Sequence, residues 1–247
     1  MTFSNNSKEL AIQDRDNYER YQTEAVFIPS KEVLSLMKGF NSLCEKYGLS
    51  FDQTYQDIIL LLELPEVRSE ILHEISKWAM MEIEGVCGGR FVFHGGGQVT
   101  FKTKNAEYSA NSMAEGFREI GILSRLLETG AIQPGVSGQL FWDSPETNLN
   151  PMMMKPLVQI LLELSRNGQR IILATHDYVL LKWFDLLIDK GKDDHALFHS
   201  LYRDADTSEI KVASTEDYLK ITPNPIDEAF GFLIDQEIEN DMGGLGK

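Results

Sequence analysis

The sequence predicts an α/β protein with a mostly parallel sheet, flanking helices and an additional α-helical lobe. Two apolar runs, at 139–143 and 170–175, enclose an amphipathic helical pattern, and this spacing is typical of a right-handed βαβ crossover. Over residues 31–84, apolar side chains recur instead at helical spacing, which predicts the lobe. The chain has 247 residues, of which 43% are hydrophobic, so it can bury a sizeable core.

Charge and cysteine content exclude several classes of protein. The net charge is −15, from 23 basic and 38 acidic residues, which argues against binding nucleic acid over a broad face. The two cysteines, Cys44 and Cys87, are too few for a four-ligand zinc site. The polar N-terminus does not resemble a signal peptide, and the longest apolar run, 58–62, is too short to cross a bilayer. We therefore expect a soluble cytoplasmic protein with no membrane partner.

The first third of the chain divides into an arm and a lobe. Residues 1–24 lack apolar periodicity and predict an arm or a frayed start. Residues 25–84 predict an entry strand, closed by Pro29, followed by three helices that begin near Lys31, Thr54 and Pro65. Gly48 and Gly85 are placed to end the first and third of these helices.

Residues 85–247 predict an α/β core that forms one compact unit with the lobe. The expected elements, in chain order, are a hairpin at 90–103, a helix at 112–130, a strand at 139–143, a helix after Asn150, a strand at 170–175, a short strand at 185–188, an edge hairpin at 199–213 that turns at 206–208, and a closing helix at 224–241. Asn150 can cap its helix and Pro151 suits the first turn, whereas Pro156 is expected to delay the regular helix or kink it.

Polar residues follow the two central strands directly. Asp143 ends the first of these strands and His176 lies just beyond the second. Because ligands of parallel α/β sheets bind at the carboxyl ends of the strands, both side chains are expected in one crevice. An aspartate there can hold a hydrated Mg²⁺ that bridges nucleotide phosphates, and the histidine can hydrogen-bond the terminal phosphate. Either residue alone would more simply be a helix cap or a loop residue, but the pair favours a functional site.

The stretch "LFWDSPETNLNP", followed by "LLELSRNGQRIILATHD", resembles the second half of an ABC-type ATPase head of the RecF- and SMC-like kind. Such heads belong to the P-loop NTPases and are grouped with AAA-family ATPases. The resemblance covers roughly residues 24–240 and implies ATP and Mg²⁺ as cofactors. It implies that Asp143 is the Walker B aspartate that binds the metal, and that His176 is the switch histidine. Ser144 occupies the position of the catalytic glutamate, and Glu146 is an acid that is kept nearby.

The segment "SMAEGFRE" resembles the signature segment of the same family. In the family this segment lies at a helix N-terminus and binds the γ-phosphate held by a partner subunit, which suits an anion site at the start of a helix. The resemblance therefore implies nucleotide-binding roles for Ser112, Glu115 and Gly116. We expect Glu115 and Gly116 to lie well away from Asp143 and His176 within one chain.

Two departures from the family pattern affect the expected activity. The sequence contains no Walker A loop, G-x-x-x-x-G-K-[ST], and the glycines at 95–97 lead into a strand. Ser144 cannot act as the general base, and losing such a base typically costs about 10²–10⁴-fold in rate. We therefore expect the C-terminal half of an ATPase, whether a truncation or a natural half-protein, that contributes Walker B, signature and switch-histidine elements. A homodimer or a partner ATPase chain would supply Walker A, and this chain alone would be inactive.

An alternative function is a non-catalytic interaction or regulatory module derived from such an ATPase, serving DNA repair or phage defence. Nucleic acid would then be reached only through the full complex. A metal-dependent nuclease or phosphatase would need a second carboxylate cluster near Asp143, and the sequence shows none with diagnostic spacing.

Overall fold

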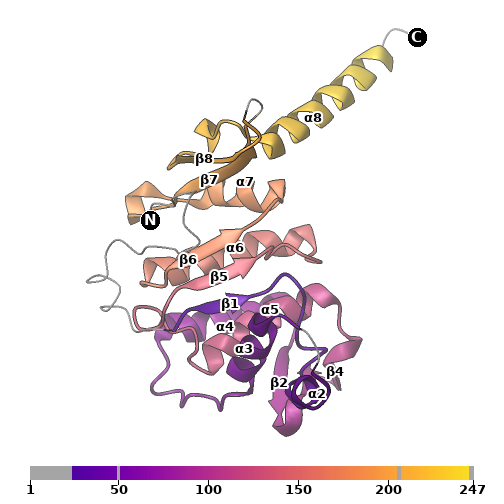
Figure 1. The fold of residues 1–247 in the computed structure, drawn as a ribbon, viewed down its shortest axis with the longest axis vertical. Helices are drawn as coiled ribbons and strands as arrows, with labels where there is room; N and C mark the ends of the chain where they lie inside the picture. Colours follow the sequence, from indigo (N-terminus) through magenta and orange to yellow (C-terminus); the bar gives the residue numbers. More distant parts are fainter. Residues whose placement is uncertain (1–23, 49–50, 205–206, 245–247) are drawn as a thin grey trace.

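A computed structural model describes residues 24–48, 51–204 and 207–244 and shows an α/β fold built on a parallel sheet (Figure 1). The sheet has the order β1-β5-β6, formed by Val26–Ile28 (β1), Leu140–Asp143 (β5) and Ile171–Ala174 (β6). All pairings in it are parallel, so the predicted fold class is confirmed. The arm expected at 1–24 lies outside the described residues, apart from Glu24.

The predicted βαβ crossover is formed by β5, helix α6 (Pro151–Arg166) and β6. The Asn150 side chain accepts a hydrogen bond from the backbone N–H of Met152 at 2.9 Å, as expected of an N-cap. The expectation that Pro156 would delay the helix is wrong, because α6 begins at Pro151. A proline there removes a single backbone hydrogen bond, and burial of Met153 and Met154 holds the first turns in place.

Over the described residues the lobe contains three helices, of which the first and the third begin later than the sequence suggested, while the second begins where it was expected. They are α2 (Phe40–Tyr47), α3 (Gln53–Glu63) and α4 (Glu74–Cys87). Helix α2 begins after Gly39, whose φ of 76° lies in the left-handed region, rather than at Lys31. Helix α4 begins after His73, whose ring accepts a hydrogen bond from the N–H of Ile75 at 3.2 Å, rather than at Pro65. Backbone geometry at single residues therefore overrides the apolar spacing.

Two antiparallel units accompany the parallel sheet. Arg90–His94 (β2), Gln98–Lys102 (β3) and Glu107–Ser109 (β4) confirm the hairpin predicted at 90–103. Phe198–Arg203 (β7) and Ile210–Thr215 (β8) confirm the second hairpin, although part of its expected turn lies outside the described residues. The expectation that it would form an edge is wrong, because among the described strands β7 and β8 pair only with each other, as a separate two-stranded sheet.

The remaining α-helices in the described ranges are α5 (Glu115–Glu128), α7 (Tyr178–Leu187) and α8 (Pro225–Gly244). Helix α7 contradicts the short strand expected at 185–188. Asp177 caps this helix, and Leu180, Trp183, Phe184 and Leu187 pack at helical spacing against the core. No helix in the described ranges is long and apolar enough to cross a membrane.

Candidate functional site at the carboxyl edge of the sheet

Asp143 and the segment leading to His176 lie side by side at the end of the sheet. Asp143 pairs in register with Ala174, the last residue of β6, and His176 follows two residues later. The N–H of Ser144 donates a hydrogen bond to the carbonyl of Ala174 at 2.8 Å. The crossover thus brings both predicted residues to one edge, as the parallel arrangement requires.

The chain turns sharply after Asp143. Ser144 has a φ of 53°, a left-handed conformation that is uncommon for a residue with a side chain. Its hydroxyl Oγ lies 3.5 Å from Oδ1 of Asp143, and both side chains are half-buried. A carboxylate and a hydroxyl are therefore presented together at the mouth of the sheet.

Glu146 lies against His176. Its Oε1 is 3.5 Å from Nδ1 of His176 and 3.4 Å from the backbone N of the same residue. The Glu146 carboxylate is buried, whereas the imidazole is exposed. The second carboxylate oxygen of Glu146 has no hydrogen-bond partner within the described part of the chain. Glu146 is thus positioned to orient the histidine rather than to contact solvent.

The donor set at this edge fits one kind of metal site and not another. Among the described residues, no group of three or more His, Cys, Asp or Glu side chains is arranged to hold an ion. Asp143 and Ser144 offer two oxygen donors, which suits Mg²⁺, because this ion usually takes few protein ligands and keeps waters or phosphate oxygens. A metal cage made by the protein alone does not fit these residues.

The N-terminus of α5 packs on the loop that follows Asp143. A Cβ atom at Gly116 would lie 2.4 Å from the carbonyl oxygen of Asn148, so only glycine allows this approach. We expected Gly116 to lie well away from Asp143 and His176, and the structure packs it on the loop that follows Asp143. Ala114 is the N-cap and gives no side-chain cap, while Ser112 and Glu115 are exposed beside it.

A buried carboxylate, missed by the sequence analysis, lies one turn farther along α5. Glu119 is 3% exposed, and neither of its carboxylate oxygens has a hydrogen-bond partner in the described ranges. Burial, with the charges of Glu32 and Glu115, raises the pKa of Glu119 to about 8, while Arg118 opposes this shift. Arg118 is itself paired with Glu32, whose Oε2 lies 2.9 Å from its Nε. The signal in the sequence is an acidic residue inside the apolar stripe of a helix.

Tyr55 of α3 connects this buried group to the strand edge. Burial raises the pKa of Tyr55, and the charges of Asp52, Asp143 and Glu119 raise it further. The negative charges of Asp143 and Glu119 therefore both act on the phenol of Tyr55.

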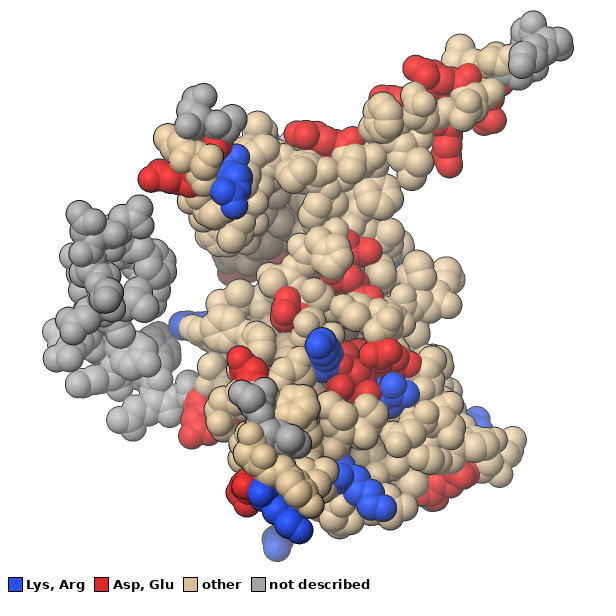
Figure 2. Space-filling model, turned by 45° about the vertical axis from the view of Figure 1, so that its right-hand side comes forward, with Lys and Arg blue, Asp and Glu red and all other residues tan. Residues whose placement is uncertain are grey.

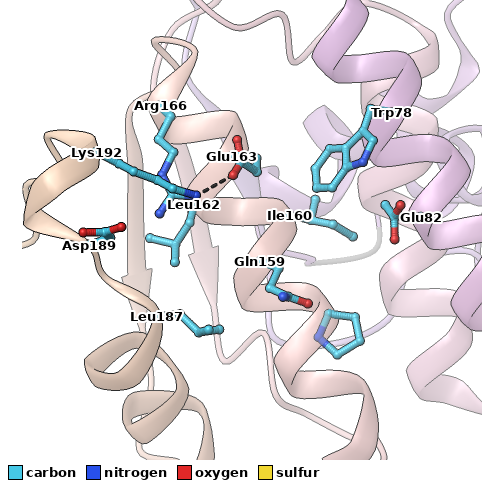
Figure 3. A pocket seen from close by; sticks show the side chains of 11 residues that line it. Trp78, Glu82, Gln159, Ile160, Leu162, Glu163, Arg166, Leu187, Asp189 and Lys192 are labelled. Atoms are coloured by element: carbon cyan, nitrogen blue, oxygen red, sulfur yellow. Dashed lines mark hydrogen bonds and ion pairs between the residues drawn. The ribbon is translucent and has the colours of Figure 1, made fainter.

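A separate cavity of about 300 Å³ lies between α4, α6 and the segment after α7 (Figure 3). Trp78 of α4 and Ile160 of α6 line it, and Arg166 pairs with Glu163 beside it at 2.6 Å. None of the site residues predicted from the sequence lines this cavity. This cavity is therefore separate from the site at the strand edge.

Part of the chain matches a known family model. Residues 100–182 match a family model described as "AAA domain, putative AbiEii toxin, Type IV TA system". All the predicted site residues, from Ser112 to His176, fall within this stretch. The resemblance of this part of the chain to an AAA-type ATPase domain is confirmed by the match. Among curated proteins, none matches the chain.

Solved structures of SMC heads are also similar to the chain. The SMC head domain from Thermotoga maritima is 15% identical, with a TM-score of 0.42, and the match covers 65% of this chain and 52% of that one. An Smc head domain from Pyrococcus furiosus, with an extended coiled coil and bound to the C-terminal domain of ScpA, is 13% identical, with a TM-score of 0.40. That match covers 91% of this chain and 54% of the other. The chain thus spans about half the length of these two structures.

Proposed function

We propose that this chain contributes one half of a nucleotide site to an ABC-type ATPase head and is itself deficient in hydrolysis. The observation that carries the proposal is the strand edge, where Asp143 pairs with Ala174 and Glu146 contacts His176. The family match over the same residues supports it.

Each residue at the edge has a chemical role in this proposal. Asp143, with the Ser144 hydroxyl beside it, would bind Mg²⁺ directly or through water, and the ion would neutralise charge on nucleotide phosphates. His176 would donate a hydrogen bond to the terminal phosphate, and buried Glu146 would orient its ring. These roles require no movement of either side chain, because the His176 ring is already exposed and the Glu146 carboxylate is already buried beside it.

The N-terminus of α5 would bind phosphate held by a second subunit. Its first N–H groups have no side-chain cap; Glu115 and Gly116 are its first two residues, and Ser112 lies just before its N-cap. A helix start of this kind attracts anions through its free N–H groups and its dipole. The second subunit would be another copy of this chain or a related ATPase chain that carries the Walker A loop.

Direct titration with nucleotide tests the assignment. Mg²⁺–ATP at millimolar concentration is expected to shift the backbone NMR resonances of residues 143–147 and 175–177, without micromolar affinity in calorimetry. Asp143→Asn should abolish these shifts, whereas the control Asp185→Asn, on α7, should leave them unchanged. Shifts that are absent, or that survive in Asp143→Asn, would contradict the proposal. Micromolar binding by the chain alone would contradict the expected need for a separate phosphate loop.

A second candidate function is a non-catalytic module that completes or regulates a partner ATPase. Ser144, in place of a carboxylate, favours it, because a serine hydroxyl is far too weak a base to activate water at neutral pH. The two candidates differ in whether Mg²⁺–ATP binds at Asp143, so the same titration separates them.

A further inference from the structure

Helix α8 projects away from the body of the protein (Figure 1). It is anchored near its start, where Phe230 stacks on Tyr178 of α7 with ring centroids 4.2 Å apart and planes 13° apart. At the same end, the backbone N–H of Asp227 donates to Oδ1 of Asn224 at 3.3 Å. Beyond this anchor the helix continues to Gly244.

Helix α8 carries a row of apolar side chains that begins at its anchor, Phe230. Phe230, Ile234, Ile238 and Met242 recur at every fourth position, so they form one ridge along the helix. We call these four residues the α8 ridge. Ile238 is 50% exposed and Met242 is 67% exposed. A row of large exposed apolar residues is typical of a surface that binds another molecule.

Acidic residues border the α8 ridge on both sides. Asp235 and Glu239 each follow a ridge residue, and Glu237 and Asp241 each precede one. Pro225–Gly244 contains six acidic residues, which also include Asp227 and Glu228, and no lysine or arginine. Figure 2 shows acidic side chains distributed along this arm.

The helix gains little stability by itself. Most of the stability of a helix in a protein comes from packing of its apolar face, and Gly231 in the interior of α8 costs roughly 0.5–1 kcal/mol relative to alanine. Its apolar residues are left in water, where each 100 Å² of exposed apolar surface forgoes about 2.5 kcal/mol of burial. A partner on the ridge would supply that burial.

The charge of α8 decides which partner fits. A second copy would place two acidic helices together with no lysine or arginine between them, and an anionic membrane surface would repel the helix in the same way. We propose that the α8 ridge is a docking helix for a protein partner whose apolar surface is bordered by lysine and arginine. The apolar row would bury itself in that surface, and the bordering carboxylates would pair with the basic rim.

A designed peptide tests the chemistry of this surface. The probe is a fluorescent amphipathic helical peptide with leucine at every fourth position and lysine on both sides of that row. A second peptide has glutamate in place of every lysine. Fluorescence anisotropy with the full chain is expected to show binding of the lysine peptide, weakening as salt rises, and no binding of the glutamate peptide.

Alanine variants separate ridge docking from general attraction of a basic peptide to an acidic protein. Ile234→Ala with Ile238→Ala should weaken binding at least tenfold, while alanine preserves the helix. Phe232→Ala is the matched control, because Phe232 is 68% exposed on α8 but lies off the ridge. It should leave affinity unchanged. Asp235→Asn with Glu239→Gln should weaken binding severalfold and reduce its salt dependence.

Three results would overturn the proposal. Equal affinity in the ridge and Phe232 variants would mean that only charge attracts the peptide. Absence of binding by the lysine peptide would mean that the ridge does not recognise this chemistry. Dimerisation of the chain in sedimentation, lost in the ridge variant, would make a second copy the occupant. Nucleotide binding at Asp143 is independent of all three results.

Discussion

The two faces of the parallel sheet have opposite surroundings. On one face, Val26, Ile28, Leu140 and Trp142 are fully buried in the core under the helices. On the other, residues of the intervening register are open, and Phe27 is 37% exposed while Ile172 is 48% exposed. Parallel sheets normally have both faces covered. The face under the helices therefore stabilises the fold, whereas the exposed face is free to contact another molecule.

Asp143 belongs to the open face by the alternation of β5. It shares the parity of Phe141, which pairs with Phe27 and Ile172, and not that of Leu140 and Trp142. The carboxylate assigned to the metal therefore stands on the exposed side of the sheet. A helix or partner that covered Phe27, Phe141 and Ile172 on this face would also contact Asp143.

The largest expected effect comes from placing a charge on each face of β6. Leu173 is half-buried and packs against the core, so Leu173→Asp should lose several kcal/mol, because an unpaired charge there is partly removed from water. Ile172→Asp, one residue earlier on the open face, should cost less than about 1 kcal/mol. Chemical denaturation followed by circular dichroism measures both. Similar losses in the two variants would mean that the two faces are equally buried.

A smaller effect on stability is expected from a change of pH, because it acts differently on the buried carboxyl of Glu119 and on Asp143 at the open face. Glu119 is buried with a folded-state pKa near 8, above the ordinary value of 4.5. Because the folded state binds this proton more tightly, its stabilising effect is present below pH 4.5 and is lost as pH rises through 8. Near pH 8.5, the free energy of unfolding of Glu119→Gln should therefore exceed that of the wild-type protein by an amount on the order of a few kcal/mol. Near pH 4.5 the two proteins should be similarly stable.

Thermal melting of the Glu119→Gln variant across pH 4.5–9 measures this difference. Asp143→Asn, on the open face, is the comparison and should show no gain of similar size at high pH. If the wild-type protein and Glu119→Gln have parallel melting profiles, the carboxyl does not titrate in this range.

A third effect concerns the contact between α5 and the loop after Asp143. Gly116→Ala brings a methyl group to 2.4 Å from the carbonyl of Asn148, and backbone must shift to relieve the clash. We expect a loss of about 1–3 kcal/mol. In Gly85→Ala, on α4, a Cβ meets nothing within 4 Å, so this variant should gain about 0.5–1 kcal/mol. Denaturation midpoints of the two variants should move in opposite directions.

The local parts of the fold could be predicted from sequence. The crossover needed only the apolar period of 157–164 and the cap at Asn150, both within one segment. The starts of α2 and α4 were wrong, because they depend on a left-handed Gly39 and on the His73 ring. The contact of Glu146 with His176 also escaped prediction, since the loop path depends on left-handed conformations at Ser144 and Asn148. Because neither residue is a glycine, nothing in the sequence indicated these left-handed conformations.

The smallest expected effect is that of restoring the acid at the open edge. Ser144→Glu should give no steady ATP turnover by this chain, because a general base accelerates only a nucleotide that is already held, and this sequence has no Walker A loop to hold it. The left-handed φ of 53° at this position costs glutamate about 1 kcal/mol, so the fold should persist. Phosphate release is measured for Ser144→Glu and for Ser144→Gln, which has the same size without the carboxylate. Turnover that appears only with glutamate, and disappears when Asp143→Asn is added, would show that the edge binds nucleotide without a separate phosphate loop. The open face would then be a complete site rather than half of one.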